Sequence, residues 1–159
     1  MVKRRQTSGT NGKREPVLDA PLQFLQTIWQ LEHALERASK RMEDTLGISG
    51  PQRFALRLIG AQQGITAGEL ATAMHLHPST VTGIVQRLES RKLVKREANN
   101  ADGRVAHLHL TAAGAKLNRP SARGTIEKAA STVLAQCSAS QQKATAAVMD
   151  ALTAELMKL

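Results

Sequence analysis

Short polar side chains gather on one face of a helix that we expect at residues 78–90, immediately after a tight turn. Apolar residues recur at helical spacing along this segment and predict that its other face is buried. Small hydroxyl and amide groups donate and accept hydrogen bonds, which is the chemistry that reads base edges in the major groove of duplex DNA. The candidate base-contacting residues are Ser79, Thr80, Thr82 and Gln86, and Gly83 would let the helix approach the bases closely.

Three arginines near this helix have the chemistry of backbone and groove contacts. Arg87 and Arg91 fall at its end, where we expect their guanidinium groups to reach phosphates, which position a protein on DNA but carry little sequence information. Arg104 lies at the tip of an expected hairpin and is suited to a minor groove, because narrow A·T tracts attract arginine.

Capping and turn signals predict the elements that must position these residues. Thr66 and Glu69 form a capping box that opens a short helix. Pro78 biases His77 away from the helical conformation and suits the first turn of the next helix, so the chain turns between the two helices. A short helix, a tight turn and a second helix with a polar outer face are typical of a helix-turn-helix.

A β-hairpin is expected directly after the second helix. Residues 93–97 and 105–110 are predicted strands, and residues 99–103 between them are typical of a turn. In the second strand, alternate residues are apolar, which predicts one buried face.

Long helices are expected on both sides of this region. Asp19 and Pro21 mark the start of the first helix, and Gly47 ends it because glycine tolerates the left-handed conformation. Ser49 begins a capping box for the helix that follows.

After the hairpin, Thr111 is placed to cap a helix that Pro120 interrupts. The helix resumes beyond the proline, and Ser138 or Ser140 caps a last helix. The predicted fold is therefore mainly α with a small β-hairpin.

The composition limits the function classes. The 159 residues carry a formal net charge of +9, with a pI near 10.5, which favours a polyanionic partner. Residues 1–14 hold five basic residues and no acid, and we interpret them as a disordered tail, an arm that touches phosphate, or both. Two Phe, one Trp and no Tyr argue against base stacking on single strands.

Little in the sequence supports a disulfide-bonded, metal-binding, membrane-spanning or catalytic protein. A single cysteine, Cys137, excludes an intramolecular disulfide framework, and we interpret it as a small hydrophobe. The histidine pairs at 75 and 77 and at 107 and 109 lack the further ligands of a metal site. No apolar run is long enough for a membrane span, and no signal peptide or catalytic motif is found, so we expect a cytoplasmic protein without cofactor, metal or enzymatic activity.

The order of elements and several motifs resemble the MarR-type winged helix-turn-helix transcription regulators, from about residue 20 to the end. The motifs are Ile65-Thr-Ala-Gly-Glu-Leu-Ala71, Pro78-Ser-Thr-Val-Thr-Gly-Ile-Val-Gln-Arg-Leu-Glu89, Leu93-Val-Lys-Arg96 and Asp102-Gly-Arg104, which leads to Leu108-His-Leu-Thr-Ala-Ala-Gly114.

The resemblance implies a division of the chain and a mode of action. It implies a basic tail at 1–18, a dimerisation helix at 19–48, a winged helix-turn-helix lobe at 49–111 and C-terminal dimerisation helices at 112–159. The resemblance implies an obligate homodimer that reads a palindromic DNA site. It also implies a protein that usually represses transcription until a small molecule, often aromatic or phenolic, binds. By the same resemblance, Asp102 braces the wing through an arginine and Arg104 is its minor-groove finger. The alternative is a winged-helix module that binds protein and has no specific affinity for DNA.

Two positions depart from the family pattern. Lys92 stands where the family usually has a glycine after the recognition helix, so a lysine must adopt the helix-ending conformation. Gly103 stands where a second basic residue often precedes Arg104, which leaves one basic finger and a more flexible tip.

The effector site is predicted least directly. Trp29 and His33 lie on adjacent turns of the first helix, and Arg53 and Arg57 on adjacent turns of the second. Trp29 is suited to stack on an aromatic ring, and an arginine to pair with its carboxylate. The alternative, which we favour, is that Trp29 belongs to the dimer core and His33 to the surface.

Overall fold

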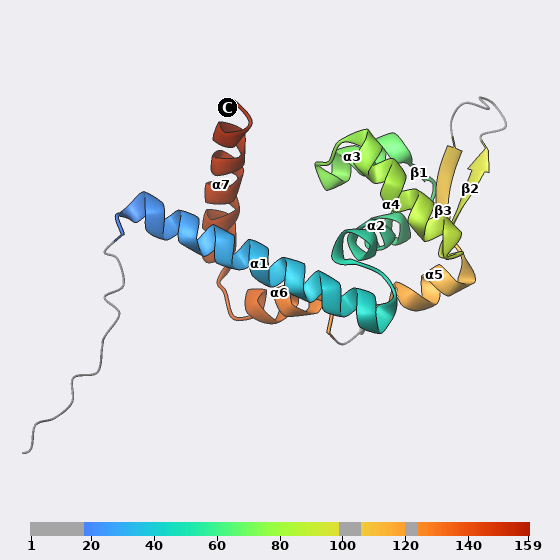
Figure 1. Ribbon diagram of the computed structural model, residues 1–159, viewed down its shortest axis with the longest axis horizontal. Coiled ribbons are helices and arrows are strands. Elements are labelled where there is room, and N and C mark those ends of the chain that lie inside the picture. The colour runs from blue at the N-terminus through green and yellow to red at the C-terminus, as the bar shows by residue number, and fades with distance from the viewer. Residues whose placement is uncertain (1–17, 99–105, 120–123) are drawn as a thin grey trace, which may run out of the picture. The chain divides into compact units, whose positions relative to one another are not determined.

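The computed structural model describes residues 18–98, 106–119 and 124–159. Its contacts divide the chain into two compact units, residues 1–33 and 34–159. The elements are α1 (Ala20–Leu46), α2 (Gly50–Ala61), β1 (Ile65–Thr66), α3 (Ala67–Met74), α4 (Pro78–Ser90), β2 (Val94–Ala98), β3 (Ala106–Leu110), α5 (Ala112–Leu117), α6 (Ile126–Leu134) and α7 (Ala139–Leu156) (Figure 1). The expected tail and wing tip, with Asp102, Gly103 and Arg104, lie outside the described residues.

Both ends of α1 are those that the sequence predicts. The carboxylate of Asp19 accepts a hydrogen bond from the backbone N–H of Leu22 at 3.0 Å. At the other end, Gly47 has φ of +73°, the left-handed conformation that ends a helix at low cost for glycine.

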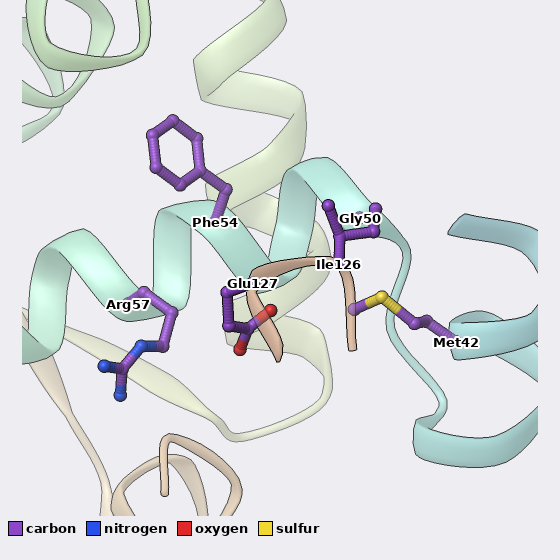
Figure 2. Close-up of a pocket in the computed structure, with 6 residues that line it drawn as sticks. All are labelled: Met42, Gly50, Phe54, Arg57, Ile126 and Glu127. Carbon is purple, nitrogen blue, oxygen red and sulfur yellow. The ribbon is translucent and has the colours of Figure 1, made fainter. Parts of the chain in front are cut away.

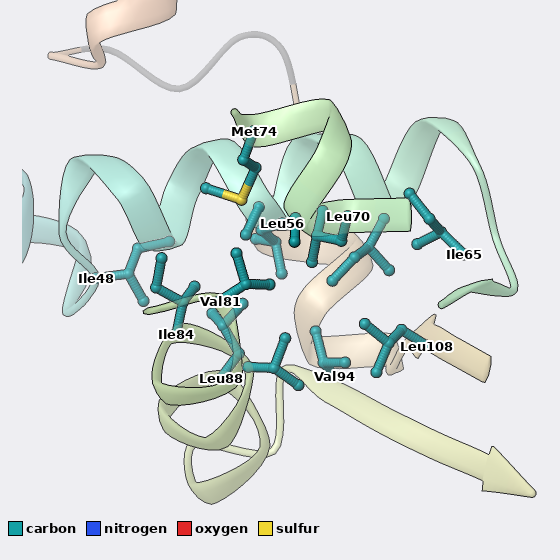
Figure 3. Close-up of a cluster of buried hydrophobic side chains, with 14 residues drawn as sticks. Ile48, Leu56, Ile65, Leu70, Met74, Val81, Ile84, Leu88, Val94 and Leu108 are labelled. Carbon is teal, nitrogen blue, oxygen red and sulfur yellow. The ribbon is translucent and has the colours of Figure 1, made fainter. Parts of the chain in front are cut away.

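The hydrophobic core of the second unit lies among α2, α3, α4 and the small sheet (Figure 3). Each fully buried Val, Leu or Ile side chain contributes about 1.5–3 kcal/mol relative to an exposed one. The large aliphatic side chains without solvent exposure are Ile48, Leu56, Ile59, Leu70, Val81, Val85, Leu88 and Leu108.

The sheet has three antiparallel strands in the order β1-β3-β2. The predicted hairpin is confirmed, with Leu108 opposite Arg96 on one side and opposite Ile65 on the other. The sequence analysis missed β1, because a strand of two residues has no periodicity to detect.

The recognition helix α4 ends in the Schellman geometry, in which two consecutive backbone N–H groups bond back into the last turn. Lys92 N donates to Glu89 O at 2.7 Å, and Leu93 N donates to Leu88 O at 2.9 Å. Lys92 has φ of +56°, so the expected strained lysine is confirmed. A side chain in this conformation costs about 1–2 kcal/mol that a glycine would not.

Thr111 and Gly114 fasten the end of the hairpin to the end of α4. Thr111 Oγ1 accepts a hydrogen bond from Gly114 N at 3.1 Å and donates to Lys92 O at 2.6 Å, and Thr111 N donates to Leu93 O at 3.0 Å. A Cβ at Gly114 would lie 2.0 Å from Leu93 O, so only glycine fits there.

The C-terminal helices begin at the expected caps. Helix α5 ends at Leu117, before Pro120, and α7 is capped by Ser138 rather than Ser140, with Gln141 N donating to Ser138 Oγ at 3.2 Å. Neither α6 nor α7 contains a buried residue. Their exposed large apolar side chains include Val133, Leu134, Val148 and Leu156.

Replacing Gly114 with alanine should destabilise the fold by about 1–3 kcal/mol, because the new methyl group would overlap the Leu93 carbonyl. Gly68→Ala is the matched control, since nothing lies within 4 Å of its Cβ position. In a helix it should be neutral or stabilising by up to about 1 kcal/mol. The urea concentration at the unfolding midpoint measures the stability of both variants. Equal midpoints would contradict the close contact between residue 114 and the Leu93 carbonyl.

Candidate nucleic-acid interface and effector cavity

Helix α4 presents the predicted polar face to solvent. Its opposite face is buried through Val81, Ile84, Val85 and Leu88. Gly83 is half-buried, and nothing lies within 4 Å of the position where its Cβ would stand. The exposed predicted contacts are Ser79, Thr80, Thr82, Gln86, Arg87 and Arg91. The helix therefore offers one continuous surface of small polar and basic groups.

The first turn of α4 is ordered by side chains that also belong to the predicted interface. His77 Nδ1 accepts a hydrogen bond from Ser79 N at 3.3 Å and lies 2.7 Å from Ser79 Oγ. Thr82 Oγ1 donates to Pro78 O at 2.9 Å, which leaves its lone pairs as acceptors. The sequence analysis placed His77 in the turn and missed its capping role, because histidine is not among the usual capping residues.

The positive charge around α4 is divided between paired and unpaired side chains. Arg96 Nε lies 3.0 Å from both carboxylate oxygens of Glu89, and Lys95 Nζ lies 2.5 Å from Glu97 Oε1. Among the described residues, no carboxylate is within ion-pair distance of Arg87 or Arg91. These two guanidinium groups therefore keep their charge for another partner.

Arg91 also contacts the end of α1. Its Nη1 lies 2.6 Å from the position where a Cβ on Gly47 would stand. A side chain at residue 47 would therefore meet the Arg91 guanidinium.

A cavity of about 390 Å³ opens between α1, α2 and α6 within residues 34–159 (Figure 2). Its lining residues are Met42, Gly50, Phe54, Arg57, Ile126 and Glu127. The wall is mainly apolar with two charged groups at its border. This volume lies in the range of small-molecule sites, about 300–1,000 Å³.

Gly50 lets the three helices meet beside this cavity. Its backbone N–H donates to Ser39 Oγ at 2.8 Å. A Cβ at Gly50 would lie 2.9 Å from Ile126 Cδ1 and 3.2 Å from Ser39 Oγ. The helices therefore approach one another closely beside the cavity, and a larger residue at position 50 would alter that approach.

The structure changes the role expected for Arg53, one of the predicted effector contacts. Its side chain is 1% exposed. Its Nε donates to Glu127 Oε1 at 2.6 Å, its Nη2 to Arg119 O at 3.0 Å, and its Nη1 to Leu117 O. The guanidinium is used inside the protein, which corrects the expectation that it would meet a ligand carboxylate. Arg57 does line the cavity, and its Nη1 donates to Asn118 O and, at 3.2 Å, to Asn118 Oδ1.

Comparison with known proteins agrees with this geometry. Residues 48–106 match the MarR family. An HTH-type transcriptional repressor of Mycobacterium tuberculosis is 29% identical over 125 residues, which are 79% of this chain and 88% of the relative. The repressor MdtR of Bacillus subtilis is 35% identical over 68 residues, 43% of this chain and 44% of the relative.

The matched region contains helices α2, α3 and α4 and strands β1 and β2 of this chain. Solved structures share the fold of the chain. MepR of S. aureus, in a complex with DNA, aligns with a TM-score of 0.71 at 21% identity over 84% of this chain and 97% of the other. PcaV of Streptomyces coelicolor, with its natural ligand, aligns with a TM-score of 0.69 at 22% identity over 87% and 97%. The chain is thus similar to MarR-family proteins and to proteins named as transcriptional repressors.

The remaining predicted effector residues, Trp29 and His33, both belong to α1. Trp29, with 61% of its surface exposed, and His33 lie on α1 within the unit of residues 1–33, whereas all cavity-lining residues come from the other unit. In the described part of the chain, no group of three or more His, Cys, Asp or Glu side chains is arranged to hold a metal ion. No helix there is long and apolar enough to cross a membrane.

The capping box of α3 fixes where the helix-turn-helix begins. Glu69 Oε2 accepts hydrogen bonds from Thr66 N at 2.8 Å and Thr66 Oγ1 at 2.9 Å. These bonds favour the carboxylate and lower the pKa of Glu69, the backbone bond being the larger cause. A lowered pKa stabilises the fold above the unfolded-state pKa, and this stabilisation is lost as pH falls through the folded-state value.

Thr66→Val should raise the pKa of Glu69 part of the way to its ordinary value, because the hydroxyl donor is lost and the backbone donor stays. An NMR pH titration of the Glu69 side chain measures the change. The pKa of Glu97, which Lys95 lowers, is the internal control and should not move. An unchanged Glu69 pKa would show that the hydroxyl plays no part.

Proposed function

We propose that this chain is a homodimeric repressor that binds a palindromic operator with α4 in the major groove. We also propose that it releases the operator when a small molecule fills the α1–α2–α6 cavity. The observation that carries the proposal is the polar outer face of α4, opposite a face buried in the core. A major groove about 12 Å wide admits such a helix.

The α4 residues would divide the work of recognition. Ser79, Thr82 and Gln86 would bond base edges, and Gln86 is suited to a bidentate contact with adenine. Arg87 and Arg91 would contact phosphates, since no carboxylate of the described residues pairs with either of them. Asp102 and Arg104, outside the described residues, stay predicted wing contacts, and Thr80 and Gly83 would support close approach.

Exposed apolar side chains on α6 and α7 support a dimer. Val133, Leu134, Val148 and Leu156 are each at least 47% exposed in the single chain. A second copy is the occupant that would cover such helices in a family that acts as homodimers. Two α4 helices would then read half-sites about 10 bp apart.

The cavity supports an aromatic or phenolic effector. Phe54 supplies a ring at its wall, and Arg57 supplies a cation at its border. A neighbour in fold, PcaV, was solved with its natural ligand, which favours a ligand-responsive role here. Trp29 and His33 stay predictions for this effector.

Genomic fragments retained by the purified full-length chain should share a palindrome. Gln86→Ala should relax base preference at one position of each half-site by about 1–3 kcal/mol.

Arg87→Ala should weaken binding across sequences and reduce the salt slope by about 1 per subunit contact. Lys158→Ala removes an equal charge at the C-terminus, outside the proposed interface, and is the control. Retention of DNA fragments that depends neither on their sequence nor on the salt concentration would refute DNA recognition. Binding only to an acidic protein would support the interaction-module alternative.

Ile126→Trp should abolish binding of the effector, because the indole would fill the cavity. Lys128→Trp is the control, since it adds the same group to an exposed position on α6 that does not line the cavity. A panel of phenols and aromatic acids, screened by thermal shift, provides ligands, since binding to the folded state raises its stability. A ligand that stabilises both variants equally would show that the effector binds elsewhere.

A further inference from the structure

The buried Arg53 depends for its counter-charge on a residue at the wall of the cavity. Arg53 is 1% exposed, and the one carboxylate within ion-pair distance of it in the described chain belongs to Glu127. Glu127 is 34% exposed and lines the cavity. The same carboxylate therefore neutralises a charge in the interior and borders the space that a ligand would occupy.

We propose that the Arg53–Glu127 ion pair couples occupancy of the cavity to DNA binding. A molecule that hydrogen-bonds to the Glu127 carboxylate competes with Arg53 for it and loosens α2 from Leu117 and Arg119, at and just after the end of α5. This inference rests on the proposed function, because it assigns the regulation of the same cavity.

Arginine makes this coupling strong because it cannot shed its charge. A guanidinium keeps its proton in proteins, so a buried arginine that loses its carboxylate stays charged and uncompensated. The two backbone carbonyls that Arg53 also contacts, Leu117 O and Arg119 O, supply dipoles but no full charge. Weakening the bond to Glu127 therefore disfavours the position of the whole Arg53 side chain.

Helix α2 connects this pair to α4. Arg53 and Arg57, one turn apart, both bind the backbone at and just after the end of α5, at Leu117, Asn118 and Arg119. On its other face, α2 contributes Leu56 and Ile59 to the core that also contains α4 side chains. Close packing transmits small shifts, so a change in how α2 is held reaches α4.

Arg57 has different contacts from Arg53 and so provides a comparison. It borders the cavity itself, and it donates hydrogen bonds to the oxygens of Asn118 rather than to Glu127. Arg57 can contact a ligand directly, whereas Arg53 acts through Glu127 as a positioning residue.

Three variants of the full-length chain test the coupling, with a labelled operator duplex recovered by genomic selection. Glu127→Gln keeps the shape but leaves Arg53 uncompensated, so duplex affinity without any ligand should fall about ten-fold or more. The double variant Arg53→Met, Glu127→Met removes both charges, and it should bind duplex as the wild type does. Glu155→Gln, which breaks an exposed pair with Lys158, is the control and should change nothing.

The fluorescent phenol 2-naphthol is the ligand in the second part of this test. It should weaken duplex binding by the wild type and by Glu155→Gln, and have no effect on the double-Met variant even where its own fluorescence reports binding. Melting temperatures separate a structural role from coupling, since a purely structural pair would change melting and leave duplex affinity and the naphthol response untouched.

The outcomes distinguish this inference from the function on which it rests. Wild-type duplex affinity in Glu127→Gln, measured well below its melting temperature, would overturn the coupling and leave the repressor function standing. A double-Met variant that still responds to bound 2-naphthol would also overturn it. A wild-type chain without duplex affinity would overturn both.

Discussion

The burial of one face of α4 is the constraint on which the rest of the interface depends. Val81, Val85 and Leu88 have no solvent exposure, so the rotation of the helix about its axis is fixed by the core of the lobe. The side chains on the opposite face then have to point outward. Both ends are held as well, by the His77 cap at the start and by the left-handed Lys92 at the end. Recognition chemistry is thus positioned by packing rather than by the polar residues themselves.

Local signals predicted most of this fold. The Thr66–Glu69 box, the proline after His77 and the cap at Thr111 each act within a few residues, and each is found in the structure. Lys92 was predicted to take a strained conformation because it stands where the family that the sequence resembles usually has a glycine after the helix. Such features depend on neighbours in the chain and can be inferred from sequence alone.

Features that depend on distant residues were missed or misjudged. Strand β1 exists because it pairs with β3, 43 positions later from Ile65 to Leu108. Arg53 was predicted to contact an effector because an arginine is suited to pair with a carboxylate, but its partner Glu127 lies 74 positions away. The cavity itself is formed by three helices that meet at Gly50, and no local pattern indicates it. The exposed face of α4 was predictable, whereas the way in which a ligand would influence it was not.

The direct test of DNA recognition by α4 is a comparison of backbone amide NMR spectra with and without an operator duplex. The largest shifts should fall on the exposed face of α4, at Ser79, Thr82 and Gln86, including the side-chain amide of Gln86. A scrambled duplex of equal length should produce smaller shifts there at the same salt concentration, because phosphate contacts remain and base contacts are lost. Saturating operator that leaves the α4 amides unchanged, or operator and scrambled duplexes that give the same shifts, would contradict this account.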